Sequence, residues 1–230
     1  MTNPLKMTLL SATLVALLLP AAAQTSNPTP PTGSAPTSTA PSQPAPPVQP
    51  APAPQTKPGE TIAQHKENQQ NRIANGIANG KLTAGEAGTL EKQESNLNHE
   101  ETDMRKMDDG KLTSADRTAL RQQQNQMSNE IYQDKHNAAA QKQDPTSQAG
   151  KRAENQQDRI AQGVRSGQLT AGESSNLEKQ ESNINKEVAQ DRNANGGHMT
   201  AQERAQVNAQ QNKVSKQIYK DKHNVRRQAK

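Results

Sequence analysis

Residues 80–86 have the sequence GKLTAGE, and residues 167–173, which lie 87 positions later, have the sequence GQLTAGE. Each stretch ends in a Thr-x-x-Glu pattern that is typical of a helix start. In such a capping box, the Thr hydroxyl accepts a hydrogen bond from the third helical N–H, and the acid reaches back to the cap N–H. The preceding glycine suits the left-handed residue that ends a helix. The heptapeptide therefore predicts a helix end, a tight turn and a new helix.

The same pattern occurs twice more, as GKLT at 110–113 and GHMT at 197–200, each 30 residues after the preceding copy. An apolar residue precedes every threonine, at the position where a hydrophobic staple would pack. The predicted helix-capping pairs are Thr83 with Glu86, Thr113 with Asp116, Thr170 with Glu173, and Thr200 with Glu203.

The chain contains an internal duplication. Residues 67–137 align without a gap onto residues 154–224, with 37 identities in 71 positions. Apolar residues recur in steps of seven and four, which favours a narrow apolar seam on each helix and not the alternation of a strand. We therefore predict an all-α fold of two tandem repeats, each a helical hairpin or small bundle; coiled-coil dimers are the alternative. The predicted helices are 61–79, 84–108, 114–137, 149–166, 171–195 and 201–226.

The N-terminal part of the sequence predicts export. Residues 1–23 combine Lys6, a short apolar stretch and three alanines, which is typical of a signal peptide. Its apolar stretch is shorter than the roughly 20 residues that span a bilayer, so we expect no transmembrane segment after cleavage. Residues 24–59 predict a disordered Pro/Thr/Ser-rich linker. Helical repeat 1 (60–137), a linker (138–150) and helical repeat 2 (151–230) follow, in a periplasmic or extracellular protein.

The composition limits how such a protein can be stabilised. Only 29% of the 230 residues are hydrophobic, and the chain has no Phe, Trp or Cys. The lack of cysteine excludes disulfides and thiolate metal sites. Because little apolar surface is available to offset chain entropy, we expect marginal stability, or stabilisation by self-association or a protein partner.

Charge is divided unequally between the two repeats. Residues 61–137 carry 10 basic and 12 acidic side chains, whereas residues 148–230 carry 15 and 9. One face of the last predicted helix gathers Lys213, Lys216, Lys220, His223 and Arg227. Such a face can bind an anionic partner such as a lipid or an acidic polymer, and a merely solvated face is the alternative. We expect no genomic nucleic acid, because the chain is predicted to be secreted.

Two kinds of metal site are considered. The glycine, the threonine and the acid resemble the second half of an EF-hand calcium loop, but the oxygen ligands expected before Gly110 are replaced by Arg105 and Met107. His136 and His223 each follow an acid by two residues, a spacing that points side chains in different directions on a helix. No catalytic motif is present, so we expect no enzyme activity and no cofactor.

The units LTAGE, LTSAD, LTAGE and MTAQE resemble the Leu-Thr-x-x-Gln motif of periplasmic Spy-type stress chaperones, with an acid in place of Gln. That resemblance implies an all-helical protein that binds unfolded clients. The whole repeat also resembles uncharacterised secreted bacterial helical-repeat proteins. The resulting hypothesis is a non-enzymatic extracytoplasmic binding or scaffold protein, of which a chaperone-like binder of polypeptide is one form. A degenerate EF-hand-like calcium or metal binder and a structural spacer are the alternatives.

Overall fold

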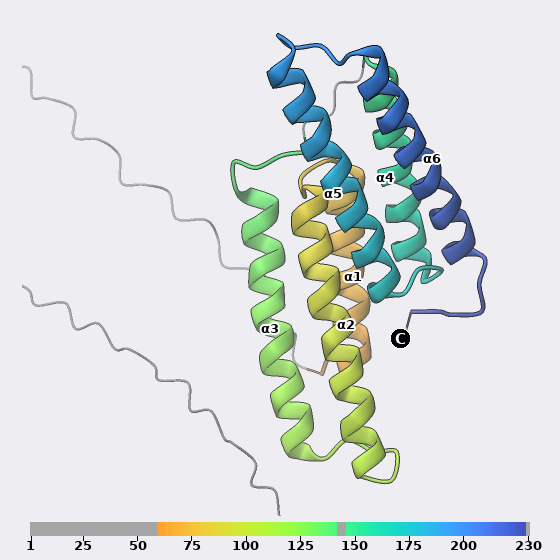
Figure 1. The fold of residues 1–230 in the computed structure, drawn as a ribbon. Helices are drawn as coiled ribbons and strands as arrows, with labels where there is room; N and C mark the ends of the chain where they lie inside the picture. Colours follow the sequence, from red (N-terminus) through yellow and green to blue (C-terminus); the bar gives the residue numbers. More distant parts are fainter. Residues whose placement is uncertain (1–58, 142–145, 229–230) are drawn as a thin grey trace, which may run out of the picture. The chain divides into compact units, whose positions relative to one another are not determined.

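The computed structural model describes residues 59–141 and 146–228, so the predicted signal peptide and nearly all of the Pro-rich linker lie outside the described residues. The described residues form six α-helices and no strand, and the all-helical fold class predicted from the sequence is confirmed (Figure 1). The helices are α1 (Ile62–Ala78), α2 (Ala84–Met107), α3 (Ser114–His136), α4 (Gln148–Ser166), α5 (Ala171–Ala194) and α6 (Ala201–Lys222).

The helices begin where the sequence places the capping threonines. Thr83 Oγ1 accepts from the Glu86 N–H at 3.3 Å, and Glu86 Oε2 accepts from the Thr83 N–H at 2.8 Å. The same reciprocal pair forms at the starts of α3, α5 and α6. Thr61 and Gln64 form a further capping box at the start of α1, which the sequence analysis did not identify. The acids of the four Thr-x-x-acid motifs therefore have a structural role.

Replacement of one cap should have a modest and local effect. Thr113→Ala removes the acceptor for the Asp116 N–H, and a lost Thr cap typically costs about 1 kcal/mol. The expected result is a drop of about that size in the free energy of unfolding, measured by urea denaturation. Thr118→Ala, within the same helix, should be neutral or slightly stabilising because alanine favours helix; an equal loss in both variants would contradict the capping role.

The helix ends depend on the predicted glycines. Gly80, Gly110, Gly167 and Gly197 all have positive φ, between 65° and 95°, a backbone conformation that other residues adopt at a cost. At the first repeat's initial turn, the Leu82 N–H donates to Gly76 O at 3.0 Å and so satisfies a carbonyl at the end of α1.

Each set of three helices has its own hydrophobic core. One cluster joins buried residues of α1, α2 and α3 with a single residue of α4, Ala161. The other joins residues of α4, α5 and α6 with a single residue of α1, Ala74. The apolar seams predicted for the separate helices therefore pack within this chain.

Leu82 precedes Thr83 and Leu169 precedes Thr170. Each of these leucines packs onto a glycine of the preceding helix. Leu82 and Leu169 are fully buried. A Cβ atom built on Gly76 would lie 2.6 Å from Leu82 Cδ1, and one built on Gly163 would lie 2.6 Å from Leu169 Cδ1. Both distances are far below van der Waals contact, so these glycines are required by close packing and not by an unusual φ.

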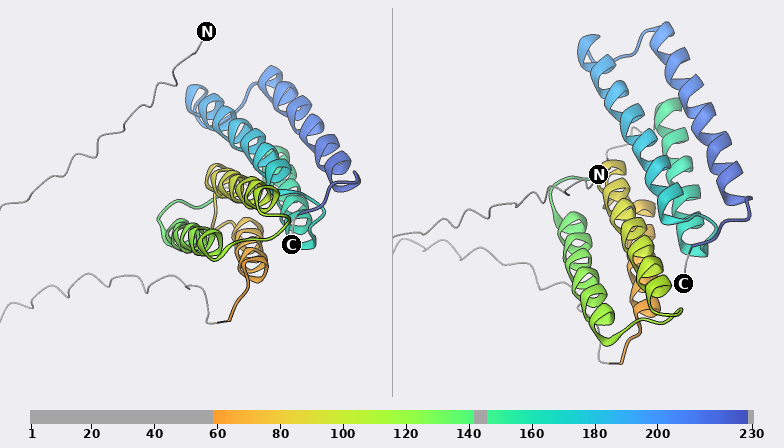
Figure 2. Two further views of the ribbon diagram at one scale, coloured as in Figure 1. Left: turned by 90° about the horizontal axis from the view of Figure 1, so that it is seen from below. Right: turned by 60° about the horizontal axis from the view of Figure 1, so that its bottom comes forward.

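Small residues line the contact between α2 and α5. An ideal Cβ on Gly85 would lie 3.4 Å from Ser182 Oγ, and one on Gly172 would lie 3.4 Å from Ser95 Oγ. The start of each helix therefore faces the middle of the other, so α2 and α5 run antiparallel (Figure 2). Ser175 Oγ donates to Gly88 O at 2.7 Å across this interface. This is the most extensive contact between the helices of the two repeats, and α1 packs against α4 beside it.

Candidate anionic-partner surface

Three of the four lysines of α6 lie on the side of the helix that faces away from the core. α6 packs against α4 and α5 through Val207, Val214 and Ile218, which are buried. Lys213, Lys216 and Lys220 are exposed and form no ion pair with any described residue. They follow one another at steps of three and four, so they span about 10 Å along the helix axis.

The chain turns back after α6, which corrects the prediction that this helix continues to residue 226. α6 ends at Lys222. The Gln228 N–H donates to Gly167 O at 3.1 Å, and Gln228 Oε1 accepts from the Ala171 N–H at 2.6 Å. Asn224 Nδ2 donates to Glu173 Oε1 at 2.8 Å. Since these bonds anchor the tail to the start of α5, a straight continuation of α6 is excluded.

Residues 225–227 form an exposed strap between α6 and that anchor. Val225, Arg226 and Arg227 are all exposed. The two arginines border a hollow of about 390 Å³ that is also lined by His99 and the first turn of α5. Arg226 Nη1 lies 3.8 Å from Glu173 Oε1. We define the basic surface as the exposed cations of α6 and the strap, namely Lys213, Lys216, Lys220, Arg226 and Arg227.

Repeat 1 builds the same scaffold without these charges. The Gln141 N–H donates to Gly80 O at 3.0 Å, and Gln141 Oε1 accepts from the Ala84 N–H at 2.9 Å, as Gln228 does in repeat 2. The residues of repeat 1 that correspond to the basic surface are Gln126, Asn129, Gln133, Ala139 and Ala140. The helix and the strap therefore form with neutral side chains at all five positions, so the fold does not require the cations.

Repeat 2 carries a further cation, Arg152, on α4 where this helix packs beside α6. Arg152 Nη2 donates to Asn212 Oδ1 of α6 at 2.5 Å. Its counterpart in repeat 1 is His65, which is buried and lies 3.0 Å from Ser128 Oγ and 3.3 Å from Glu60 Oε2. Burial lowers the pKa of His65, and its neighbour Glu60 opposes this effect. A buried histidine in one repeat is therefore replaced by a permanently charged arginine in the other.

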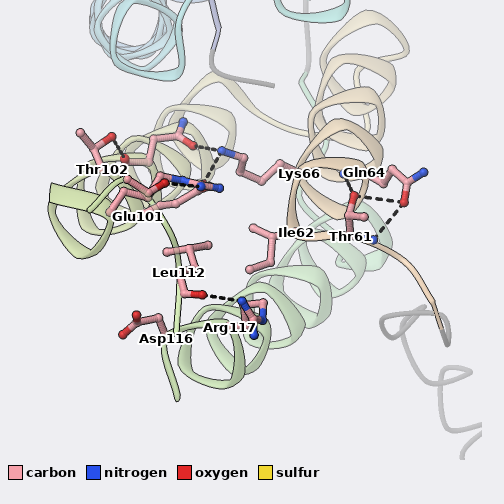
Figure 3. A network of polar contacts seen from close by, with 12 residues as sticks. Thr61, Ile62, Gln64, Lys66, Glu101, Thr102, Leu112, Asp116 and Arg117 are labelled. Atoms are coloured by element: carbon pink, nitrogen blue, oxygen red, sulfur yellow. Dashed lines mark hydrogen bonds and ion pairs between the residues drawn. The ribbon is translucent and has the colours of Figure 1, made fainter. Parts of the chain in front are cut away.

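Repeat 1 has a buried cation, but it is fully engaged within the fold. Figure 3 shows Lys66 reaching from α1 to α2, where its Nζ donates to Glu101 Oε2 at 2.8 Å and to Asn98 Oδ1 at 2.9 Å. Glu101 also accepts from Arg105 at 2.8 Å. In repeat 2, Ala153 and Val188 take the places of Lys66 and Glu101 and line a hollow of about 220 Å³. The ion pair is thus a core contact of repeat 1 only.

The histidines and acids considered for metal binding have other contacts. His136 Nδ1 and His223 Nδ1 each lie 2.7 Å from the carbonyl oxygen of the tyrosine one turn earlier, and each ring stacks on that tyrosine at 4.2 Å. In residues 59–141 and 146–228, no group of three or more His, Cys, Asp or Glu side chains is arranged to hold a metal ion.

Four glutamates are buried in the α2–α5 region, which the sequence analysis missed. They are Glu91, Glu94, Glu178 and Glu181, and each is 0% exposed. Gln70 Nε2 donates to Glu91 at 3.3 Å, and Gln157 Nε2 donates to Glu178 at 2.9 Å. The remaining oxygens of these two carboxyls, and both oxygens of the other two, have no hydrogen-bond partner among the described residues.

Burial favours the protonated form of these carboxyls. It raises the pKa of Glu178 and of Glu181 to about 8, and that of Glu94 to about 7. It also raises the pKa of Glu91 well above the ordinary value, and the nearby Glu94 and Glu178 add to this rise. Lys66 opposes the rise at Glu94, and Arg159 opposes it at Glu181. The packing of α2 against α5 is therefore most favourable when these groups are neutral.

Few large apolar side chains remain exposed after the two cores have formed. In the described parts of the chain they are Met107, Tyr219 and Val225. Two of the three belong to the C-terminal end of α6 and to the strap, next to the basic surface. None of the described helices is both long and apolar enough to span a bilayer.

Neither protein-family models, nor curated proteins, nor solved structures give a match to this chain. Function is therefore inferred from its own residues, and above all from the differences between its two repeats.

Proposed function

We propose that this chain is a non-enzymatic, extracytoplasmic binding protein that holds an anionic partner on the basic surface of repeat 2. The observation that carries the proposal is the contrast between the two repeats. The same helix and the same anchored strap present five cations in repeat 2 and five neutral residues in repeat 1. Since the fold forms without the charges, a role in binding accounts for their concentration on one surface.

The electrostatics of this surface support the assignment. The lysines of α6 have no ion-pair partner among the described residues, so an incoming anion does not have to displace an internal acid. The nearest acid of the same helix, Asp221, is buried and accepts from Gln217 at 2.8 Å. Clustered cations raise the local concentration of an anionic partner and its association rate.

Binding to inorganic polyphosphate would test this function. In the variant that carries the repeat 1 residues, K213Q/K216N/K220Q/R226A/R227A, affinity should fall at least 100-fold, since each cation near an anionic surface contributes about 1 kcal/mol. Wild-type affinity should also fall steeply as salt is raised. Isothermal titration calorimetry at two salt concentrations measures both effects.

A control variant separates a specific surface from net charge. Neutralisation of five exposed lysines elsewhere changes the net charge by the same amount; these are Lys81, Lys92, Lys111, Lys179 and Lys186. This control should lose much less affinity than the basic-surface variant. Equal losses in the two variants would refute a localised binding surface, and an absence of polyphosphate binding in the wild type would refute the proposed function.

A further inference from the structure

The two large apolar side chains that repeat 2 leaves exposed lie next to the basic surface. Tyr219 is 66% exposed and Val225 is 97% exposed. Lys216, Tyr219 and Lys220 of α6, and His223 directly after its end, follow one another at steps of three, one and three. They therefore share one side of the helix. Val225 directly precedes Arg226 in the strap. This part of the chain therefore presents cations and apolar side chains to the same partner.

Local contacts hold both apolar groups at the surface. The Tyr219 ring stacks on His223 with centroids 4.2 Å apart, and His223 Nδ1 lies 2.7 Å from Tyr219 O. The strap is fixed at its far end by the hydrogen bonds of Gln228 and near its start by that of Asn224. Val225 is thus displayed from an anchored segment. In repeat 1 its position is occupied by Ala138, and Tyr132 is only partly exposed.

This combination of groups matches a particular class of anionic partner. A soluble polyanion attracts the cations but gains nothing from an exposed valine. The surface of an anionic bilayer offers phosphate headgroups to the cations and an apolar boundary to tyrosine and aliphatic side chains. Tyrosine in particular has an apolar ring and a polar hydroxyl, which suits it to this interface.

We propose that the C-terminal end of α6 and the strap dock peripherally on the headgroup region of an anionic phospholipid bilayer. In this arrangement Lys216, Lys220, Arg226 and Arg227 contact phosphate groups, and Tyr219 and Val225 insert their side chains at the boundary below. This inference rests on the proposed function, because it identifies the anionic partner of the same surface.

Vesicle cosedimentation of the full chain tests the proposal. The expected result is binding to vesicles of phosphatidylglycerol mixed with phosphatidylcholine, and weak binding to phosphatidylcholine alone. Y219S/V225A should weaken binding to the phosphatidylglycerol vesicles roughly tenfold, because burial of one aliphatic side chain contributes about that factor. The same variant should bind polyphosphate as the wild type does. Comparison between variants removes any contribution of residues 1–58, and thermal melting checks that the variant is folded.

The outcomes separate this inference from the proposed function. If the chain binds polyphosphate but shows no preference for phosphatidylglycerol vesicles, the inference that the partner is a bilayer is wrong, and the proposed binding of an anionic partner stands. That inference is also wrong if the Y219S/V225A variant is folded and binds those vesicles with the affinity of the wild type. If neither polyphosphate nor vesicles are bound, both proposals fail.

Discussion

Glu178→Gln is expected to stabilise this protein strongly at pH 8 and to have little effect at pH 4.5. The carboxyl is fully buried between the repeats, and its pKa of about 8 lies far above the ordinary value of 4.5. Each pKa unit corresponds to about 1.4 kcal/mol, so ionisation of this group in the folded state costs on the order of 5 kcal/mol. Gln has nearly the same shape as the protonated acid and keeps an acceptor for Gln157.

The direction of the pH effect follows from proton linkage. Between pH 4.5 and about 8, the folded state holds a proton on Glu178 that the unfolded state releases. The contribution of Glu178 to the free energy of unfolding is therefore fully present below pH 4.5, and it decreases as pH rises through this window. Glu94 and Glu181 act in the same direction over windows that end near 7 and 8. Wild-type stability should fall continuously from pH 5 to pH 8.

Urea denaturation at pH 5 and pH 8 measures this effect. The gain from Glu178→Gln at pH 8 should reach at least about 2 kcal/mol, which leaves room for relaxation around the charge. Glu154→Gln on the exposed side of α4 is the matched control and should change stability little at either pH. The account is contradicted if the wild-type protein is as stable at pH 8 as at pH 5 and Glu178→Gln does not raise its stability. These carboxyls would then not be buried as described.

The second large effect is expected where Leu82 packs on Gly76. Leu82→Ala empties a fully buried site and should cost about 2–5 kcal/mol. Gly76→Ala should also destabilise, by about 1–3 kcal/mol, because its new methyl would lie 2.6 Å from Leu82 Cδ1. The double variant should cost less than the sum of the two, since the methyl added at position 76 then fills part of the space that the leucine side chain leaves.

The coupling between these two sites is the decisive quantity. A double-mutant cycle measured by chemical denaturation should give a favourable interaction energy of at least about 1 kcal/mol. Gly85→Ala is a suitable control, because its Cβ would meet only Ser182 Oγ at 3.4 Å and Thr83 Oγ1 at 3.9 Å; it should be neutral or slightly stabilising. Additive costs for Gly76→Ala and Leu82→Ala would contradict the leucine-on-glycine contact.

The features that could be predicted from the sequence are those determined by local chemistry. Glycines with positive φ, threonine caps and apolar steps of three and four act within a few residues, so they placed five of the six helices closely. The predicted end of the last helix, at residue 226, is wrong because Gln228 anchors the strap to Gly167, a residue 61 positions earlier. No local pattern in residues 222–228 indicates that distant contact.

The buried glutamates were missed for a different reason. Acids in a polar segment such as LEKQES are typical of a solvated face, and the sequence alone does not reveal that α5 covers this side of α2. One available signal was their register. Glu94 lies four residues after Leu90 and three before Leu97, which places it on the apolar seam itself, and Glu181 occupies the equivalent position between Leu177 and Ile184.

The basic surface was only partly recognised from the sequence. The sequence predicts that Lys213, Lys216, Lys220 and Arg227 share one helical face. The structure places all four at the surface, but Arg227 lies in the strap beyond the end of α6, so the shared helical face is wrong for that residue. Arg226, and the anchored strap that displays both arginines, depend on the tertiary contact of Gln228. The alignment of the two repeats already places a neutral residue of repeat 1 at each matching position. Only the structure shows that these positions lie on the same helix and strap in both repeats.

The most direct test moves the basic surface from repeat 2 to repeat 1. The starting protein is K213Q/K216N/K220Q/R226A/R227A, and the added changes are Q126K, N129K, Q133K, A139R and A140R. Polyphosphate affinity, measured by calorimetry at low salt, should return to within about tenfold of wild type, because α3 and its strap present the same positions. If the transplanted protein is folded but still fails to bind, five cations on this scaffold are not sufficient for binding, which contradicts the account.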